Sequence, residues 1–389
     1  MASHTASYKS VLGAILAGLS IASICFSLAA CRRLLGENPP YVTTEALVQA
    51  GRDYAHGVQH GVQQAAPGNG TPAVDIDSSE HYEKIIRVFV EHEGFDQLEA
   101  AAYKARVWKG RLIGGYWKLR AFYEAVGHPL HFDRPTESEW KDHIAFIKKW
   151  VATRPESATP RIALAESYLN YAWDARGEGY AHTVSSERWE LVEQRVGLAK
   201  AALLDASHLK EKCPYWYEVG QQISLLDGWN KVLAREFYEQ AIAFDPTYDN
   251  FTLNYGYYLL PKWDGEEGET RALAEEAAAR LGEPQGSILY YEMATLFANE
   301  WELGQPPMQG MSWQRVKQGH AAHHQLYGIG GGQRNGFALL AYSVGDKEAA
   351  KEAFAEIGSD WSNYVWRSAE SFDRAKTWAN SDEPVAAQP

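Results

Sequence analysis

Apolar residues recur every three or four positions along most of the chain from about residue 80 onward. The spacing of Tyr82, Ile85, Ile86, Phe89 and Val90 is that of one face of an α-helix. Strand-like alternation is nowhere convincing. The pattern predicts helices near 80–106, 116–126, 136–153, 160–175, 187–206, 214–226, 231–244, 249–260, 268–281, 287–302, 312–327, 335–344, 347–357 and 364–379. The sequence therefore predicts an all-α protein.

A repeat signature lies at Ala234, Tyr238, Ala241 and Pro246, which follow one another at steps of four, three and five. A tetratricopeptide-type hairpin places small residues where its helices approach closely, an aromatic residue in the gap and a proline after the second helix. One hairpin cannot bury its apolar face alone, so neighbours must stack on both sides. The prediction is a tetratricopeptide-like α-solenoid of stacked helical hairpins, and a generic helical bundle is the alternative.

Two further segments carry parts of the same signature. Ala338, Ala350 and Phe354 fit the hairpin pattern, although Ile357 stands where a small residue is expected. A weaker candidate begins at Pro160, and a long insertion separates its two helices.

The chain begins with a targeting segment. Residues 10–30 contain no charge, follow Lys9 and end in Leu-Ala-Ala before Cys31. A short apolar run with small residues before the cut is typical of a secretory signal. The ending resembles a bacterial lipoprotein signal, in which Cys31 would be diacylated and become the mature N-terminus. We therefore expect a lipoprotein-type signal peptide over 1–30 and lipidation of Cys31.

Two other interpretations of this segment stay open. The run is about as long as the ~20 residues that span a bilayer. Arg32 and Arg33 follow it, and by the positive-inside bias they would keep the body of an uncleaved, anchored protein in the cytoplasm. Ordinary cleaved secretion is the third interpretation. All three place the protein at or across a membrane.

The composition divides the rest of the chain. Residues 31–79 are rich in proline, glycine and alanine and predict a disordered tether, with room for a short helix over 43–64. The helical-repeat body is expected over 80–380 and a frayed polar tail over 381–389.

The net charge limits the kinds of partner that the protein can bind, and the cysteine content limits its disulfides. With 50 acidic and 37 basic residues, the net charge of −13 opposes binding of nucleic acid and of anionic lipid surfaces. Basic partners, neutral peptides and glycans are more compatible. Of three cysteines, Cys25 leaves with the signal and Cys31 is acylated, so Cys213 is left alone as a buried thiol without a disulfide.

Several segments together resemble one family. They read GYWKLRAFY at 115–123, ALAESY at 163–168, YAWDARG at 171–177, LKEKCPYWY at 209–217 and YLLPKW at 258–263. They closely resemble the bacterial family of the domain of unknown function 4034, from about residue 80 to 370. The resemblance implies a tetratricopeptide-like helical fold. It brings no established activity and no catalytic residues.

The candidate partner-binding residues are aromatic: Trp216, Tyr217, Tyr255, Tyr257 and Trp263. Such rings can line a groove and stack on peptide side chains or sugar rings. Tyr255 belongs to a helical stripe for which core packing is the favoured interpretation, because aromatic residues dominate the cores between helices. Tyr257 lies off that stripe and is the best candidate to face a groove.

Paired acids beside aromatic residues suggest a second chemistry. Asp174 follows Trp173, and Asp264, Glu266 and Glu267 follow another tryptophan. Two carboxyl groups facing each other across a sugar would hydrolyse a glycosidic bond. The competing interpretation places Glu266 and Glu267 in the first turn of a helix, where they oppose its dipole.

Three histidines form an HxxHH pattern at His320, His323 and His324. Steps of three and four put them on one helical face, as in a metal site. No HExxH pattern accompanies them, so we expect an exposed polar face and predict no metal and no cofactor.

These features predict a membrane-anchored helical-repeat scaffold that binds a peptide or protein partner in the cell envelope, with its body outside the cytoplasm. The inference from architecture to binding is an analogy. The alternative is an envelope enzyme that acts on glycan or polymer through acidic residues in a helical pocket. No catalytic motif favours the enzyme.

Overall fold

Helices dominate the computed structural model, which describes residues 41–61, 74–75, 78–130, 134–177, 179, 181–297 and 307–381. The α-helices in this part of the chain are α3 (Thr44–Gly61), α4 (Ser79–Glu91), α5 (Phe95–Trp108), α6 (Lys118–Val126), α7 (Glu137–Thr153), α8 (Thr159–Arg176), α9 (Ser186–Ser207), α10 (Tyr215–Leu226), α11 (Lys231–Phe244), α12 (Asn250–Tyr258), α13 (Glu269–Leu281), α14 (Gln285–Thr295), α15 (Trp313–Tyr327), α16 (Gly331–Val344), α17 (Lys347–Ile357), α18 (Asn363–Trp366) and α19 (Ala369–Asn380). The only described sheet pairs β1 (Val74–Asp75) with β2 (Arg111–Leu112) in parallel. The all-α prediction is confirmed.

Two predicted helices are each divided in the structure. The helix expected over 80–106 is interrupted between α4 and α5, where Glu93 has a positive φ of 50° and Gly94 precedes the new helix. The helix expected over 364–379 is interrupted at Arg367, which has a φ of 63°. Ser368 then caps α19, because its side chain accepts a hydrogen bond from the backbone N–H of Ser371.

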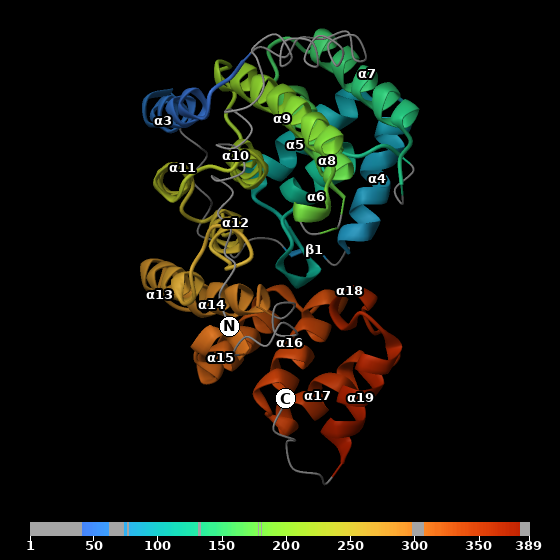
Figure 1. The fold of residues 1–389 in the computed structure, drawn as a ribbon, viewed down its shortest axis with the longest axis vertical. Helices are drawn as coiled ribbons and strands as arrows, with labels where there is room; N and C mark the ends of the chain where they lie inside the picture. Colours follow the sequence, from blue (N-terminus) through green and yellow to red (C-terminus); the bar gives the residue numbers. More distant parts are fainter. Residues whose placement is uncertain are drawn as a thin grey trace. The chain divides into compact units, whose positions relative to one another are not determined.

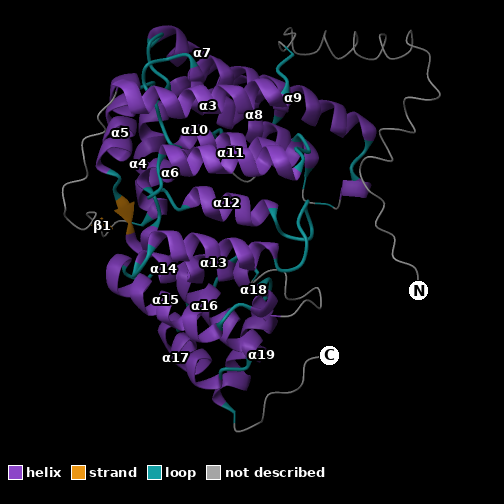
Figure 2. Cartoon of the chain, turned by 90° about the vertical axis from the view of Figure 1, so that its left-hand side faces the viewer, coloured by secondary structure: helices purple, strands orange, loops and turns teal. Residues whose placement is uncertain are grey.

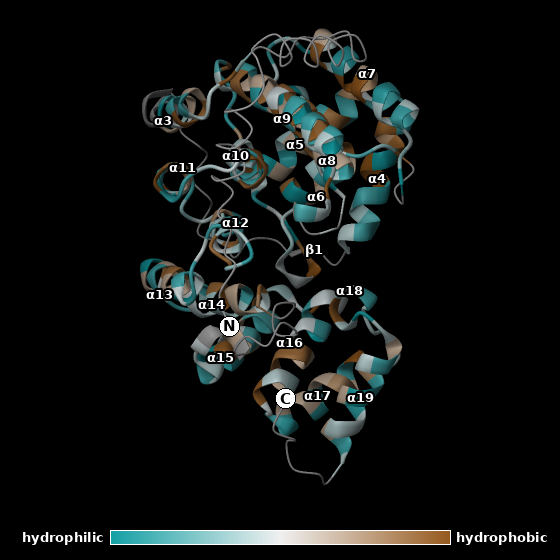
Figure 3. Ribbon diagram, viewed as in Figure 1, coloured by the Kyte–Doolittle hydropathy of each residue, from teal (hydrophilic) through white to brown (hydrophobic). Residues whose placement is uncertain are grey.

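The hairpins stack in two rows. Helices α8, α10, α12, α14 and α16 contact one another in that order and form the first row. Each of these helices pairs with the one that follows it in the chain, and we call those partners, α9, α11, α13, α15 and α17, the second row; α3 contacts both α9 and α11. Figure 2 shows α3, α11, α12 and α13 lying one above another. Each helix carries hydrophilic and hydrophobic positions side by side (Figure 3), as stacking against several neighbours requires.

The repeat signature lies where helices meet. Ala234, Tyr238 and Ala241 are all buried on α11, and Pro246 follows the end of that helix. The ring of Tyr238 stacks on Tyr255 of α12 with the ring centroids 4.7 Å apart. The small residues therefore allow close approach and the aromatic residue fills the gap, as the sequence predicts.

Helix α3 corrects the predicted tether. It packs against α9 and α11, which lie far from it in the sequence (Figure 1). Leu47 and Tyr54 are fully buried there, and Thr44 Oγ1 donates a hydrogen bond of 2.9 Å to Asp227. Because these side chains complete the core, the helix belongs to the folded body. The signal over 1–30, Cys31, and the tether over 31–40 and 62–73 lie outside the described residues, as does the tail beyond Ser381.

The loop between α5 and α6 connects distant parts of the body. Gly114 and Gly115 both have a φ of 77°, a conformation that favours glycine. The Gly114 carbonyl accepts a hydrogen bond of 2.9 Å from Gln333 of α16, and Arg111 pairs with Asp249 at the start of α12. The loop thus brings the α6 side chains next to α12.

Candidate functional site

Helix α6 supplies the centre of a polar cluster. Arg120 and Glu124 are four residues apart on α6 and so lie on one face, and Tyr116, two residues before the helix begins, contacts both. The Arg120 guanidinium donates to Glu124 Oε1 at 2.8 Å, to the Tyr116 hydroxyl at 3.2 Å and to Glu218 Oε2 at 3.2 Å. Tyr116 itself donates to Glu124. We call these four residues, together with Glu166, the Arg120 cluster.

Glu218 lies on α10 and is completely buried. Besides Arg120, three side chains donate to its carboxyl group: the Tyr248 hydroxyl, Asn250 Nδ2 at 3.2 Å and Asn254 Nδ2 at 3.4 Å. Burial raises the pKa of Glu218, and the Arg120 charge opposes that shift. These four donors fix the Glu218 carboxyl group in place, and the carboxyl group in turn helps to position the Arg120 guanidinium.

Glu166 lies on α8 beside the same groups and is only 3 % exposed. Its Oε1 accepts a hydrogen bond of 3.2 Å from Asn170, whereas its Oε2 has no partner among the described residues. Burial, and then the nearby Glu124 charge, raise the pKa of Glu166 to about 8. The carboxyl group is therefore largely protonated at neutral pH.

An aromatic patch lies farther along the same helices. Trp173 and Trp263 meet edge to face with centroids 6.1 Å apart, and Tyr257 contacts Trp263 at 5.9 Å. The Arg176 guanidinium lies 5.6 Å and 5.7 Å from the centroids of the two tryptophans, and Lys262 lies over Tyr257. We call these five residues the Trp263 patch. The three aromatic side chains are partly exposed.

Helix α8 carries residues of both the cluster and the patch, and α12 carries a residue of the patch and Asn250, which donates to Glu218 of the cluster. Trp173 follows Glu166 by seven residues on α8, and Tyr257 follows Asn250 by seven on α12. Seven residues are about two helical turns, or about 10 Å along the axis. The amides of Asn170 and Asn254 lie between, and both side chains are partly exposed. Acids, amides and aromatic rings thus follow one another along one face of the body.

The structure removes three residues from the predicted aromatic groove. Trp216 and Tyr217 are fully buried, and Tyr255 is 6 % exposed. Helix α3 covers the first two, and the Tyr217 hydroxyl donates a hydrogen bond of 2.6 Å to the Gly51 carbonyl. These three rings therefore pack in the core, which is the interpretation that their helical spacing favours, and they do not line an open groove; the covering helix α3 was predicted to be part of the tether. Tyr257 and Trp263 remain candidates for contact with a partner.

The histidines do not form the expected exposed face. His323 is fully buried and His320 stacks on Phe337 with centroids 3.6 Å apart, whereas His324 is exposed. Burial lowers the pKa of both His320 and His323 to about 4. Nε2 of His323 lies 3.6 Å from Glu292 Oε1. Within the described residues, no three His, Cys, Asp or Glu side chains are placed to hold a metal ion.

The lone thiol and the paired acids have simpler surroundings. Cys213 is buried, its Sγ lies 3.6 Å from the Tyr123 hydroxyl, and burial raises the pKa of the thiol. Asp174 and Asp264 are exposed, and Asp264 accepts a hydrogen bond of 3.2 Å from Tyr258. The contact between Trp173 and Trp263 does bring the two predicted tryptophan–acid segments together.

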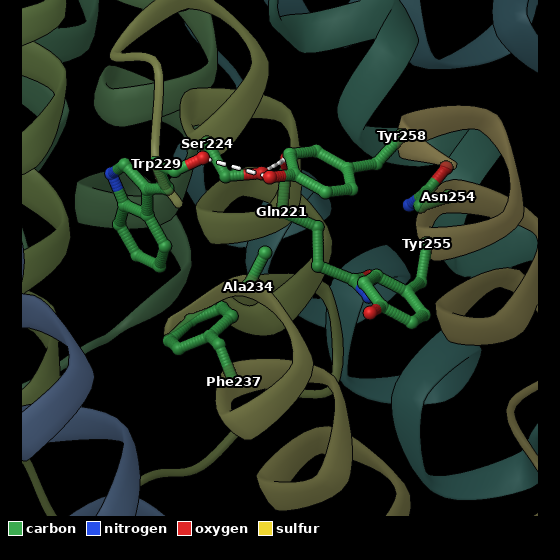
Figure 4. Close-up of a pocket in the computed structure, with 8 residues that line it drawn as sticks. All are labelled: Gln221, Ser224, Trp229, Ala234, Phe237, Asn254, Tyr255 and Tyr258. Carbon is green, nitrogen blue, oxygen red and sulfur yellow. Dashed lines mark hydrogen bonds between the residues drawn. The ribbon is translucent and has the colours of Figure 1, made fainter. Parts of the chain in front are cut away.

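The described hollows lie elsewhere. A cavity of about 10 Å³ between α10, α11 and α12 is lined by Gln221, Trp229, Phe237 and Tyr258, among others (Figure 4). That volume suits no more than one water molecule. A groove of about 580 Å³ separates α11 from α13, and ion pairs cross it from Lys231 and Arg235. Neither hollow is lined by an acid of the Arg120 cluster.

These elements define an all-helical repeat protein with a polar and aromatic face built mainly on α6, α8 and α12. The family model described as "Domain of unknown function (DUF4034)" matches residues 116–216. The match bears out the resemblance to this family over that segment, which includes Tyr116, Arg120, Glu124 and Glu166. No curated protein and no solved structure matched the chain.

Proposed function

We propose that the protein is a membrane-anchored helical-repeat scaffold that binds a peptide or protein partner in the cell envelope. The face that extends from the Arg120 cluster to the Trp263 patch is the binding surface. The carrying observation is the indole Nε1 of Trp263, which is buried and has no hydrogen-bond partner among the described residues. An unpaired buried donor is costly, and a partner carbonyl oxygen would satisfy it.

The side chains on this face suit an extended peptide. Tyr257 and Trp263 offer ring faces for apolar side chains, and cationic Arg176 and Lys262 hold the rings in place. The partly exposed amides of Asn170 and Asn254 can donate to and accept from a peptide backbone. Tryptophan, tyrosine and arginine side chains, such as those of the Trp263 patch, often carry most of the binding energy in protein interfaces.

Capture of a partner from envelope membranes tests this proposal. The tagged full-length protein is compared with Tyr257→Ala and Trp263→Ala, each of which removes a ring from the patch. Matched controls are Tyr364→Ala and Trp108→Ala, since those rings are 72 % and 68 % exposed elsewhere on the body. We expect the patch variants to lose at least tenfold in apparent affinity for the captured partner, and the controls to retain it. Equal capture by all five proteins would reject the patch as the binding surface.

The membrane attachment is a separate part of the proposal. It is motivated by the uncharged run over 10–30 and the Leu-Ala-Ala-Cys ending at Cys31. In the described part of the chain, no helix is long and apolar enough to cross a membrane. Labelling with a fatty-acid probe should mark the wild-type protein and not Cys31→Ser. An unlabelled wild-type protein that still fractionates with membranes would favour an uncleaved anchor.

An enzyme acting on envelope glycan is the second candidate, and one observation favours it. Glu166, protonated near neutral pH, lies close to Glu124, and glycoside hydrolysis uses one protonated and one ionised carboxyl group. Release of reducing sugar from purified envelope glycan by the wild-type protein, and not by Glu166→Gln, would establish the enzyme. The scaffold predicts no release by either.

A further inference from the structure

Carboxyl groups outnumber guanidinium groups around Glu166. Acids from four helices lie near one another here: Glu124 of α6 raises the pKa of both Glu83 of α4 and Glu166 of α8, and Glu218 of α10 also raises that of Glu166. The basic groups close to them are Arg87, which donates to the Pro129 carbonyl at 3.2 Å, and Arg120. Because the acids outnumber the bases here, Glu166 keeps its proton in the unbound protein, and a cation beside it would favour the charged form.

Among the described residues, no basic group donates a hydrogen bond to Glu166. Arg120 donates through Nε and Nη1 to Tyr116, Glu124 and Glu218, and no described residue donates a hydrogen bond to Glu166 Oε2. A carboxyl oxygen that is more than nine-tenths buried and unpaired is rare in folded proteins. The oxygen lies among other acids, so a cationic donor beside it would favour the ionised carboxylate and would supply the missing hydrogen bond.

Some side chains around Glu166 are partly exposed to solvent. The side chains of Glu124 and Arg120 are 31 % and 27 % exposed, and Glu83 and Asn170 are also partly exposed. The partly exposed Asn170 donates hydrogen bonds to the buried Glu166 carboxyl group and to the Gly127 carbonyl. A basic group would contact Glu124 first and would reach Glu166 when the Asn170 amide turns aside.

We propose that the partner presents a lysine or arginine side chain to Glu124 and Glu166, about three residues from the side chain that it places on the Trp263 patch. The spacing follows from the helix: Glu166 and Trp173 are about 10 Å apart along α8, and an extended peptide spans about 3.3 Å per residue. This inference rests on the proposed function, and it names the chemistry of the ligand.

Three fluorescein-labelled heptapeptides test it against the full-length protein by fluorescence anisotropy. Each carries a tryptophan, and three positions away a lysine, a norleucine or a glutamate; both orders are made. Norleucine preserves the length of the side chain and removes its charge. We expect the lysine peptide to bind at least tenfold more tightly than the norleucine peptide, and the glutamate peptide to bind weakest.

The protein variants isolate the acids. Glu124→Gln combined with Glu166→Gln should reduce the lysine preference to less than twofold. The control Glu352→Gln makes the same change in charge at an exposed position on α17 and should keep it. Circular dichroism confirms that each variant is folded.

The outcomes separate this inference from the proposed function. Absence of a lysine preference in the wild-type protein, or its persistence in the double variant, overturns the inference. If Trp263→Ala then still weakens the binding of all three peptides, the proposed binding surface stands without the basic group. Failure of every peptide to bind at millimolar concentration also overturns the inference, whatever the capture experiment shows.

Discussion

The ring of Tyr54 stacks on the ring of Trp216 with centroids 4.6 Å apart and planes 15° from parallel. The Tyr54 hydroxyl also accepts a hydrogen bond of 2.6 Å from the Cys213 backbone N–H, 159 residues away in the chain. These contacts join α3 to the start of α10. Helix α3 therefore packs against the second row of the repeat, at α9 and α11, and its Tyr54 ring covers Trp216.

Tyr54→Ala should destabilise the protein by about 3 to 5 kcal/mol, because it removes a fully buried ring and leaves a cavity. It also leaves the Cys213 backbone N–H without its hydroxyl acceptor. Urea unfolding followed by tryptophan fluorescence measures the change.

The control for this variant is Tyr364→Ala, because Tyr364 is 72 % exposed. Its free energy of unfolding should stay within about 0.5 kcal/mol of wild type. Equal values for the two variants would show that α3 does not contribute to the stability of the body.

Ala241→Trp should be among the most damaging substitutions in the body. Ala241 is fully buried on α11, where neighbouring helices approach closely. Forcing a large ring into a packed core costs about 1 to 3 kcal/mol or more. Thermal unfolding measures the effect, and an unchanged midpoint would remove the repeat register around Pro246.

The fold was predictable because its signals are local. Helical periodicity, the steps between Ala234, Tyr238 and Ala241, and capping residues such as Asp346 are all contained in short segments. The partners of α3 were not predictable, since amphipathic spacing shows that a face is buried and does not show against what. The same limit explains why Trp216 and Tyr217 were placed in an open groove.

The candidate site was predictable only in part. Tyr257 and Trp263 are partly exposed, as contact with a partner requires, and their role stays a prediction. The Arg120 cluster was missed because its acids lie on separate helices. Each acid alone resembles an ordinary polar position on a helix surface. One signal was present in the sequence: Tyr116, Arg120 and Glu124 follow at steps of four, in a segment that also carries the family resemblance.

His323→Ala should destabilise the protein by about 1 to 3 kcal/mol, contrary to what an exposed HxxHH face would give. The His323 ring is fully buried between Tyr291 and Tyr327, at centroid distances of 5.7 Å and 5.3 Å. His324→Ala is the matched control, because His324 is exposed one residue away. Chemical unfolding compares them, and a neutral His323→Ala would show that the packing around this ring contributes little.

Acid should unfold the protein partly through the same ring. Burial lowers the pKa of His323 to about 4 from its ordinary value of 6.5, so the unfolded chain binds this proton more readily. The stabilising contribution is complete above pH 6.5 and is lost as the pH falls towards 4. His323→Phe should reduce the loss of stability between pH 6.5 and 4, as measured by urea unfolding at each pH. An identical pH dependence in the variant would contradict this assignment.

Glu166 should produce the opposite dependence at higher pH. Its pKa rises to about 8 from the ordinary value of 4.5, because burial opposes the charged form. The charged and titratable groups that interact with it are Glu124, Arg120, Glu218 and Tyr215. Since the folded state holds this proton more tightly than the unfolded chain, the contribution to stability is complete below pH 4.5 and is lost as the pH rises through 8.

Glu166→Gln replaces the carboxyl group by a neutral amide of the same shape and should remove this part of the pH dependence. Between pH 5 and 9 the wild-type free energy of unfolding should fall by about 2 to 4 kcal/mol more than that of the variant, since one pH unit within the window corresponds to about 1.4 kcal/mol. The two proteins should be nearly equal in stability at pH 5, where both side chains are neutral in the folded state. Glu292 also has a pKa raised to about 8 by burial and is unchanged in this variant, so a residual slope is expected. Parallel curves for wild type and variant would show that Glu166 is ionised in the folded protein, which requires a cationic partner for its Oε2 already in the unbound state.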